Sequence, residues 1–444
     1  MKEVKLSDHF TYRKLIRFVL PSVVMMVFTS IYGVVDGYFV SNYAGKLAFA
    51  STNFIMPFLM IIGGTGFMIG TGGSALVAMT LGQGRRKDAN RYFTMLVYLT
   101  LGLGLLLTVI GILVIRPVAL FLGASAEMID KSVLYGRIVL AFNVAFMLQN
   151  LFQSLFIAAE KPKLGLLTTV AAGVTNIILD AILVGALNLN ITGAALATGI
   201  SQCIGGIIPL FYFLRPNSSL LRLTLTKIEL KVWVRACSNG FSELMSNVSS
   251  SIVGMVYNAQ LMKYIGQDGV SAYGVLMYVM FIFVAIFVGY AVGSAPIVAF
   301  HYGAGNEKEL NNLLTKSFKI MALMGVLMVV AAELLSGPFS SLYVGYDATL
   351  YAITKNAFHI FSVSFLLTGI NIFVSSFFTA LNNGAVSAAI SFLRTMLFQN
   401  AAVILMPLIM GVDGLWWSQA VAEVAAFLIS VIFLVAMRKK YKYF

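Results

Sequence analysis

Residues 92–115 read YFTMLVYLTLGLGLLLTVIGILVI, an apolar stretch without a charged side chain. A helix needs about 20 apolar residues to cross the hydrocarbon core of a bilayer, so this stretch predicts a transmembrane helix. The rest of the chain has the same character, because 59% of its 444 residues are hydrophobic and 11% are charged. A soluble protein would be about one-quarter charged. The composition therefore indicates a polytopic membrane protein and excludes a cytosolic enzyme and a secreted disulfide scaffold.

Twelve apolar segments of this kind follow one another, which predicts an all-α protein with 12 transmembrane helices. They are residues 15–40, 50–81, 92–115, 134–158, 164–187, 191–214, 233–262, 270–300, 317–336, 354–380, 386–410 and 414–437. The first segment has no small-residue cleavage site, so we expect an uncleaved span rather than a signal peptide. An even number of crossings places both termini on one side.

The basic residues indicate which side that is. The segments divide 29 of the 30 Lys and Arg residues into 23 on the side of the termini and six on the other. Because cytoplasmic loops carry the excess of Lys and Arg, we expect a plasma-membrane protein with both termini in the cytoplasm. Topology thus accounts for the net charge of +13, and no nucleic-acid partner is needed to explain it.

The second half of the chain repeats the first at a constant offset of 221 residues. The offset brings Tyr43, Gly45, Gly72, Gly82, Gly84, Asn90, Asn150 and Gly193 onto Tyr264, Gly266, Gly293, Gly303, Gly305, Asn311, Asn371 and Gly414. We therefore predict two pseudo-symmetric six-helix lobes, residues 1–214 and 233–444, joined by a cytoplasmic linker at 215–232. Parallel repeats around a central cleft are typical of carriers that work by alternating access.

Five acidic residues fall inside the predicted spans, where a carboxylate is costly and usually belongs to an ion pathway. Asp36 and Asp180 lie at similar depth on spans one and five. Asn176 lies one turn before Asp180, and Thr198 reaches the same depth on span six. Two carboxylates, an amide and a hydroxyl suit a small cation such as Na⁺, or a shared proton. The alternative is a structural hydrogen-bond cluster.

The second lobe carries the other three membrane carboxylates. Glu243 on span seven could attract a cationic substrate, carry a proton, or pair with Arg394, which lies at similar depth on span eleven. Glu423 lies in the middle of span twelve, and its role stays open. Glu333 lies near an outer end, where its side chain can reach water.

Catalytic motifs are missing from the sequence. It contains no HExxH, no GxSxG and no P-loop, and its three histidines are far apart. We therefore expect a transporter rather than an enzyme, with no cofactor other than a coupling ion.

Residues 31–37, IYGVVDG, followed by Ala44-Gly45 and by AFA at 48–50, resemble the first-span signature of the multidrug and toxic compound extrusion (MATE) family. The stretch from Gly72 to Asn90 and its repeat at 293–311 resemble the loops after spans two and eight of that family. The resemblance covers essentially the whole chain. It is nearest to the drug-exporting group of Gram-positive bacteria, and the polar residues of the first lobe resemble the DinF-type branch.

This resemblance implies export of organic cations and drugs in exchange for inward Na⁺ or H⁺. In the DinF-type branch, the residues that match Asp36, Asn176, Asp180 and Thr198 are implicated in ion coupling. The resemblance also implies cleft positions for Tyr135 and Asn150, and a bend at Pro21. Glu243 is similar to the span-seven glutamate of the NorM-type branch, but residues 354–380 lack the aspartate which that branch has in span ten. We therefore expect ion coupling in the first lobe.

A lipid or lipid-linked-sugar flippase is the alternative transport function, since it would use the same two-lobe cleft. Many Lys or Arg residues in the cleft would favour it, and Arg394 is the one basic candidate within the spans. We expect a monomer with the lipid bilayer and small organic cations as its partners.

Overall fold

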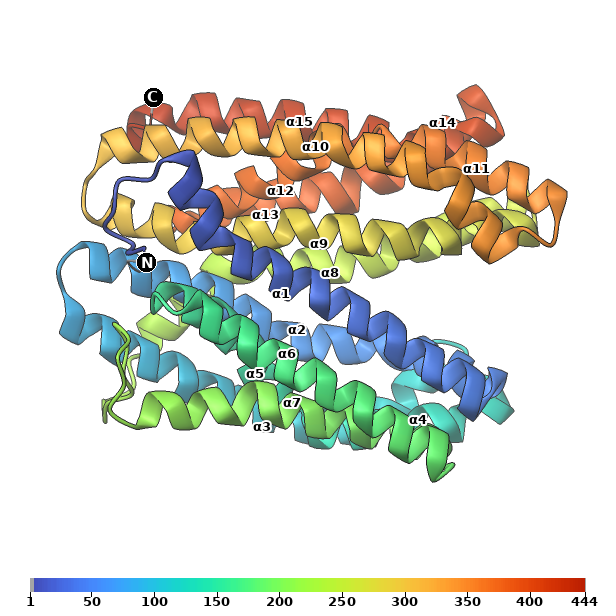
Figure 1. Cartoon of the computed structure of the whole chain (residues 1–444), viewed down its shortest axis with the longest axis horizontal. Helices are drawn as coiled ribbons and strands as arrows, with labels where there is room; N and C mark the ends of the chain where they lie inside the picture. Colours follow the sequence, from blue (N-terminus) through green and yellow to red (C-terminus); the bar gives the residue numbers. More distant parts are fainter. Residues whose placement is uncertain (1–3, 444) are drawn as a thin grey trace.

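The computed structural model describes residues 4–443, apart from the side chain of Lys46, and this part of the chain folds into helices without strands. Two bundles lie one above the other in Figure 1, the first blue to green and the second yellow to red. The first bundle contains α1 (Tyr12–Phe39), η1 (Val40–Ala44), α2 (Lys46–Gly82), α3 (Arg86–Phe121), α4 (Ala126–Ala141), α5 (Asn143–Ala158), α6 (Pro162–Leu179), η2 (Asp180–Ala186) and α7 (Asn190–Leu214). The second contains α8 (Leu230–Tyr264), α9 (Gln267–Gly303), α10 (Glu307–Val344), α11 (Ala348–Ser362), α12 (Phe365–Ala380), α13 (Gly384–Ser391), η3 (Phe392–Gln399), α14 (Asn400–Met410) and α15 (Val412–Tyr441). The all-α prediction is confirmed.

The 12 predicted crossings differ in form. In the described residues, nine helical segments are long and apolar enough to span a membrane, and two bent pairs raise the number to 11. The pairs are α4 with α5, bent by 57°, and α11 with α12, bent by 49°. The segment predicted as span seven is α8, which is not among these 11 and packs along α2 and α13. It is 35 residues long but more polar than the others, because Ser246, Asn247 and Ser250 line an internal cavity.

The helix boundaries repeat at the offset seen in the sequence. Helices α2 and α3 begin at residues 46 and 86, and α9 and α10 begin at 267 and 307. Gly45 and Gly266, which precede α2 and α9, have φ angles of 89° and 87°, a conformation that only glycine adopts easily. The repeat is therefore built into the turns as well as the spans.

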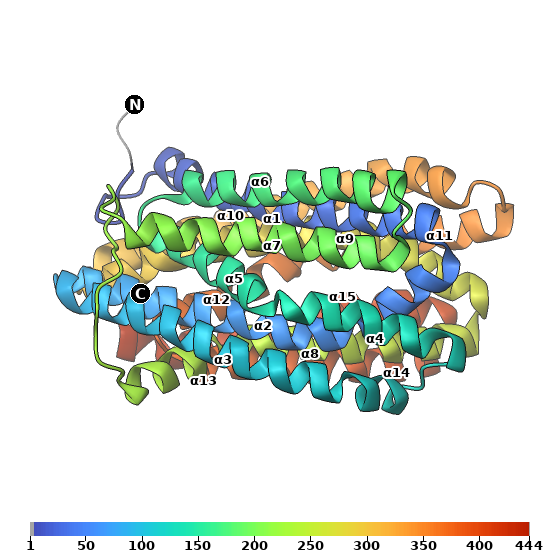
Figure 2. The same cartoon turned by 90° about the horizontal axis from the view of Figure 1, so that it is seen from below.

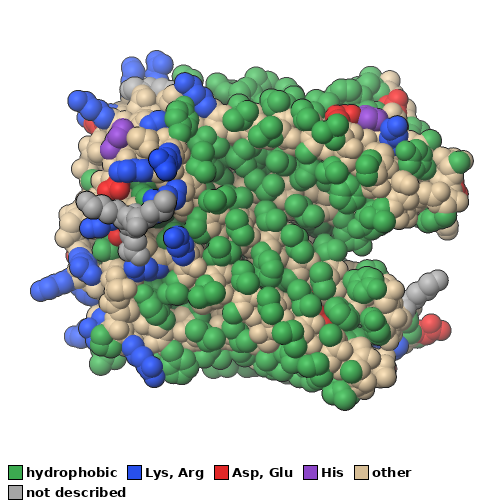
Figure 3. All heavy atoms as spheres, viewed as in Figure 1, with side chains coloured by type: hydrophobic (Ala, Val, Ile, Leu, Met, Phe, Trp, Pro, Cys, Tyr) green, Lys and Arg blue, Asp and Glu red, His purple; other side chains and the backbone are tan. Residues whose placement is uncertain are grey.

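The two bundles touch at one end of the molecule. Gly82 and Gly303 allow α2 and α9 to approach closely there, since a Cβ on either glycine would lie 2.0 Å from a carbonyl oxygen of the facing helix. Lys and Arg side chains gather at the same end, and a notch separates the bundles at the opposite end (Figure 3). We call these the basic end and the open end.

Residues 215–229, between α7 and α8, run along the basic end (Figure 2). They attach to α3, where Asn90 accepts a hydrogen bond of 3.0 Å from the backbone N–H of Arg222 and Thr94 accepts one of 3.0 Å from that of Thr224. The segment that joins the bundles is thus held against the first one.

Candidate functional site

A cavity of about 570 Å³ lies between the two bundles. Its polar lining contains residues from both halves of the chain and is rich in amide and hydroxyl groups. Of the residues singled out from the sequence, the cavity is lined by Asp36, Tyr135, Asn150, Asn176, Thr198, Glu243 and Arg394. The structure therefore gathers these seven residues around one space, whereas Pro21, Asp180, Glu333 and Glu423 are not part of the lining.

The acidic cluster of the first bundle forms one wall. The Thr198 hydroxyl donates to Asp36 Oδ1 at 3.5 Å, and Asp180 and Asn176 are further polar neighbours of the Asp36 carboxyl group. Asp180 is fully buried, and neither of its carboxylate oxygens has a hydrogen-bond partner. The side-chain oxygen of Asn176 is also buried without a partner. Four oxygen-bearing side chains thus face one another with unused acceptor atoms, which is a suitable arrangement for a small cation or a proton.

Local backbone geometry sets the position of both acids. Asp180 is the first residue of the π-helical segment η2, and the Asp36 carbonyl accepts the backbone N–H of Val40, where the π-helical segment η1 begins. π-Helical turns are rare and frequently occur at functional sites.

Tyr135 and Asn150, the cleft positions expected from the family resemblance, both line the cavity. The Tyr135 side chain is buried and Thr198 is one of its polar neighbours. Asn150 donates from Nδ2 to the carbonyl of Gly63 at 3.3 Å. Pro21 is buried inside α1, away from the cavity lining. Its neighbour Ser22 packs against α9 of the second bundle, so the proline lies where the bundles meet.

The second bundle supplies one free carboxylate. Glu243 lines the cavity, and its side chain forms no ion pair or hydrogen bond with the described residues. The option that Glu243 pairs with Arg394 is wrong, because Arg394 binds Glu423 instead. Arg394 Nε donates to Glu423 Oε2 at 3.0 Å, and Nη2 donates to Oε1 at 2.6 Å.

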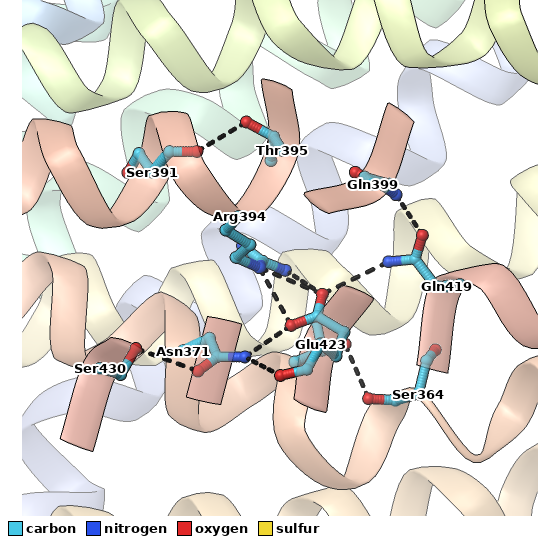
Figure 4. A network of polar contacts seen from close by, with 10 residues as sticks. Ser364, Asn371, Ser391, Arg394, Thr395, Gln399, Gln419, Glu423 and Ser430 are labelled. Atoms are coloured by element: carbon cyan, nitrogen blue, oxygen red, sulfur yellow. Dashed lines mark hydrogen bonds and ion pairs between the residues drawn. The ribbon is translucent and has the colours of Figure 1, made fainter. Parts of the chain in front are cut away.

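Figure 4 shows that Glu423 lies at the centre of a polar network. Asn371 donates to Glu423 Oε2 at 2.7 Å, and Gln419 donates to Oε1 at 3.3 Å. Gln399 extends the network through Gln419, and Ser430 donates to Asn371 at 3.1 Å. None of these amides was predicted from the sequence as a site residue, although Asn371 appeared there as the repeat partner of Asn150. The sequence did carry a signal for them, because amides inside apolar spans are buried and need hydrogen-bond partners.

The remaining acid of the membrane segments lies elsewhere. Glu333 is half-exposed on α10 and forms contacts with His359 and with the Ser362 hydroxyl, at 3.0 Å for the latter. Within residues 4–443, no group of three or more His, Cys, Asp or Glu residues could hold a metal ion. A cation bound by Asp36 and Asp180 would therefore take its other oxygen ligands from neutral groups.

Known proteins match this chain along nearly its entire length. The MatE family model matches residues 21–182 and again residues 244–404, so the duplicated halves are two copies of one family domain. The multidrug export protein MepA of Staphylococcus saprophyticus is 22% identical over 434 residues, covering 97% of this chain and 94% of the relative.

Solved structures share the fold. A multidrug resistance MATE family transporter of the MOP superfamily in an outward-facing conformation has a TM-score of 0.93 at 20% identity, covering 100% of this chain and 99% of that one. A MATE structure in complex with MaL6 has a TM-score of 0.91 at 21% identity, covering 99% and 100%. Since the family model matches well over half of the residues, in both lobes, the chain belongs to the MatE family, the multidrug and toxic compound extrusion proteins.

Proposed function

We propose that this protein exports organic cations, drugs among them, in exchange for inward H⁺ or Na⁺. The observation that carries the proposal is the cavity between the bundles, into which Asp36 and Glu243 present carboxylates that no basic side chain of the described residues neutralises. The multidrug export activity in the names of the relatives supports the substrate class.

Ion coupling is assigned to Asp36 and Asp180. Two neighbouring carboxylates in a membrane interior resist being ionised together, so an arriving H⁺ or Na⁺ relieves their repulsion. Coupling requires only that the ion and the drug bind with different affinities to the two conformations of the transporter. The excess of Lys and Arg at the basic end supports a cytoplasmic location for that end, in the plasma membrane. The conformation described here is then outward-facing, ready to release drug and to accept the ion.

The flippase alternative is disfavoured by the charge of the cavity. A lipid phosphate or pyrophosphate group would need basic partners. In the described part of the chain, the lining contains one basic residue, Arg394, and Glu423 already binds it.

Transport by purified protein in liposomes tests the proposal. With a fluorescent organic cation such as ethidium and no ATP present, we expect movement that follows an imposed ΔpH or an imposed Na⁺ gradient. The two gradients are applied separately, so the response identifies the coupling ion. A protein that moves ethidium at the same rate with and without either gradient contradicts the proposal.

Asp36→Asn and Asp180→Asn are the decisive variants, since each removes one charge and keeps a similar shape. We expect each to abolish gradient-driven transport while the protein folds normally. Asp130→Asn is the matched control, because Asp130 forms an exposed ion pair with Arg116 far from the cavity lining. Unchanged transport by both cavity variants would falsify the site assignment.

A further inference from the structure

The Arg394–Glu423 network occupies the place in the second bundle that the acidic cluster occupies in the first. At the repeat offset of 221 residues, Asn371 corresponds to Asn150 and Gln419 corresponds to Thr198. Asn150 and Thr198 both line the cavity and Thr198 donates to Asp36, whereas Asn371 and Gln419 donate to Glu423. Each bundle thus builds a polar site from equivalent helices around its own acidic group.

The charges of the two sites differ. The positions equivalent to Asp36 and Asp180 are Tyr257 and Ala401, so the second bundle lacks both acids. It carries its acid at Glu423 instead, where the first bundle has Gln202. Two acids in the first site therefore correspond to one acid in the second.

A fixed positive charge accompanies that single acid. Arg394 corresponds to Gly173, where even a Cβ would lie 2.5 Å from the ring of Phe28. The first bundle consequently has no room for a basic side chain at this position. Its acids must receive a cation from outside, whereas Glu423 has one supplied by the chain.

Arg394 also separates Glu423 from the cavity. The Arg394 side chain is 16% exposed and lines the cavity, but the Glu423 side chain is 2% exposed and does not. The guanidinium binds both carboxylate oxygens, and Asn371 and Gln419 supply further donors to them. A cation in the cavity therefore meets the guanidinium before it can meet the acid.

We propose that Arg394 is a fixed internal cation that occupies the ion site of the second bundle and so restricts coupling-ion binding to the first. This inference rests on the proposed function, because it presumes that the first bundle binds the ion. Removal of the guanidinium would leave a buried carboxylate among polar side chains, open to the cavity. Such a group takes up Na⁺ or H⁺.

Cation binding by purified protein in detergent or nanodiscs tests this directly, without a transport assay. Binding of ²²Na⁺ and proton uptake after a pH jump are both measured, so that either ion is detected. We expect Arg394→Met to bind one more cation per protein than the natural chain. The double variant Arg394→Met/Glu423→Gln should lose that gain. Arg394→Gln is the second variant in case the Met side chain prevents folding, since Gln keeps a hydrogen-bond donor toward Glu423.

The two proposals fail in distinguishable ways. The gain from Arg394→Met should persist when Asp36 and Asp180 are both changed to Asn, because it arises in the second bundle. Loss of the gain in that background overturns the inference. A folded Arg394→Met protein that binds the same number of cations as the natural chain also overturns the inference, since Arg394 would then have only a structural role. If the Asp36→Asn/Asp180→Asn variant binds cations like the natural chain, the proposed coupling site fails and the second-bundle result is unaffected.

Discussion

At the scale of single residues, the cavity combines two unpaired acids with one neutralised base. Asp36 belongs to a cluster that has Thr198 as a hydrogen-bond donor, whereas Glu243 stands alone on α8. We therefore predict different roles for the two acids, with the coupling ion at the cluster and the positive charge of a drug at Glu243. The carboxylate of Glu243 is free to move toward a bound cation, because none of residues 4–443 forms a hydrogen bond or ion pair with it.

Glu243→Gln should therefore weaken drug binding and leave ion binding intact. We expect the Kd for a monocationic drug to rise about tenfold, equivalent to about 1.4 kcal/mol, since one charge-assisted contact is lost. Fluorescence titration with ethidium measures the Kd, and proton or ²²Na⁺ binding checks the ion site. A neutral drug analogue is the matched ligand control, because its affinity should not change. Equal loss of affinity for both ligands would indicate distortion of the cavity instead.

At the scale of helices, glycine pairs determine how closely the bundles approach. Gly82 on α2 faces the carbonyl of Phe300, and Gly303 on α9 faces that of Met79, in a pseudo-symmetric contact at the basic end. Residues 79 and 300 are themselves related by the repeat offset. Two positions without side chains thus permit this contact at the closed basic end.

Gly82→Val should prevent this closure. Its Cβ would lie 2.0 Å from the Phe300 carbonyl oxygen, which belongs to a helix backbone and cannot move alone. We expect loss of transport and a longer distance between spin labels placed across the basic end, measured by double electron–electron resonance. Gly102→Val is the control, because a Cβ on Gly102 in α3 meets no atom within 4 Å. A Gly82→Val protein that transports as well as the control would contradict this role of the contact.

At the scale of the whole molecule, the segment before α1 bridges the two bundles. The backbone N–H of Leu6 donates to Glu160 in the first bundle at 2.6 Å, and that of Phe10 donates to Glu309 in the second at 2.9 Å. Leu6 and Phe10 are both completely buried. Separation of the bundles at the basic end therefore requires release of at least one of these attachments.

The attachment to Glu160 should depend on pH. Glu160 lies between α5 and α6. Burial raises its pKa above the usual value, and this effect is larger than the lowering by the hydrogen bond from Leu6. Because the attached state holds the proton more tightly, attachment is strongest below the usual pKa of a glutamate and weakens as pH rises from that value through the raised pKa. Resonance distances between a label on residue 7 and one on α6 check this. Glu160→Gln should abolish the pH dependence, and a dependence that survives in this variant must come from another group.

Much of the architecture follows from the sequence, because hydrophobicity and helical length are local properties. The segment predicted at 92–115 lies inside α3, and the one at 233–262 lies inside α8. The bends within the spans could not be predicted from the sequence. The segment predicted at 134–158 is two helices that meet at Phe142, and no proline or glycine marks the break. The π-helical segments η1, η2 and η3 could not be predicted from the sequence either, since their hydrogen bonds depend on how neighbouring helices pack.

The amino-acid sequence was sufficient to predict the membrane class, the repeat and the acids that are costly to bury. It could do so because burial of a charge in lipid is unfavourable wherever the residue lies. Which charges form ion pairs depended on how the helices pack. Arg394 could have paired with Glu243 or with Glu423, and depth along a span did not distinguish them. Packing of η3 against α15 places the guanidinium within 2.6 Å of Glu423 and leaves Glu243 facing the cavity, because contact between distant residues depends on helix rotation and tilt.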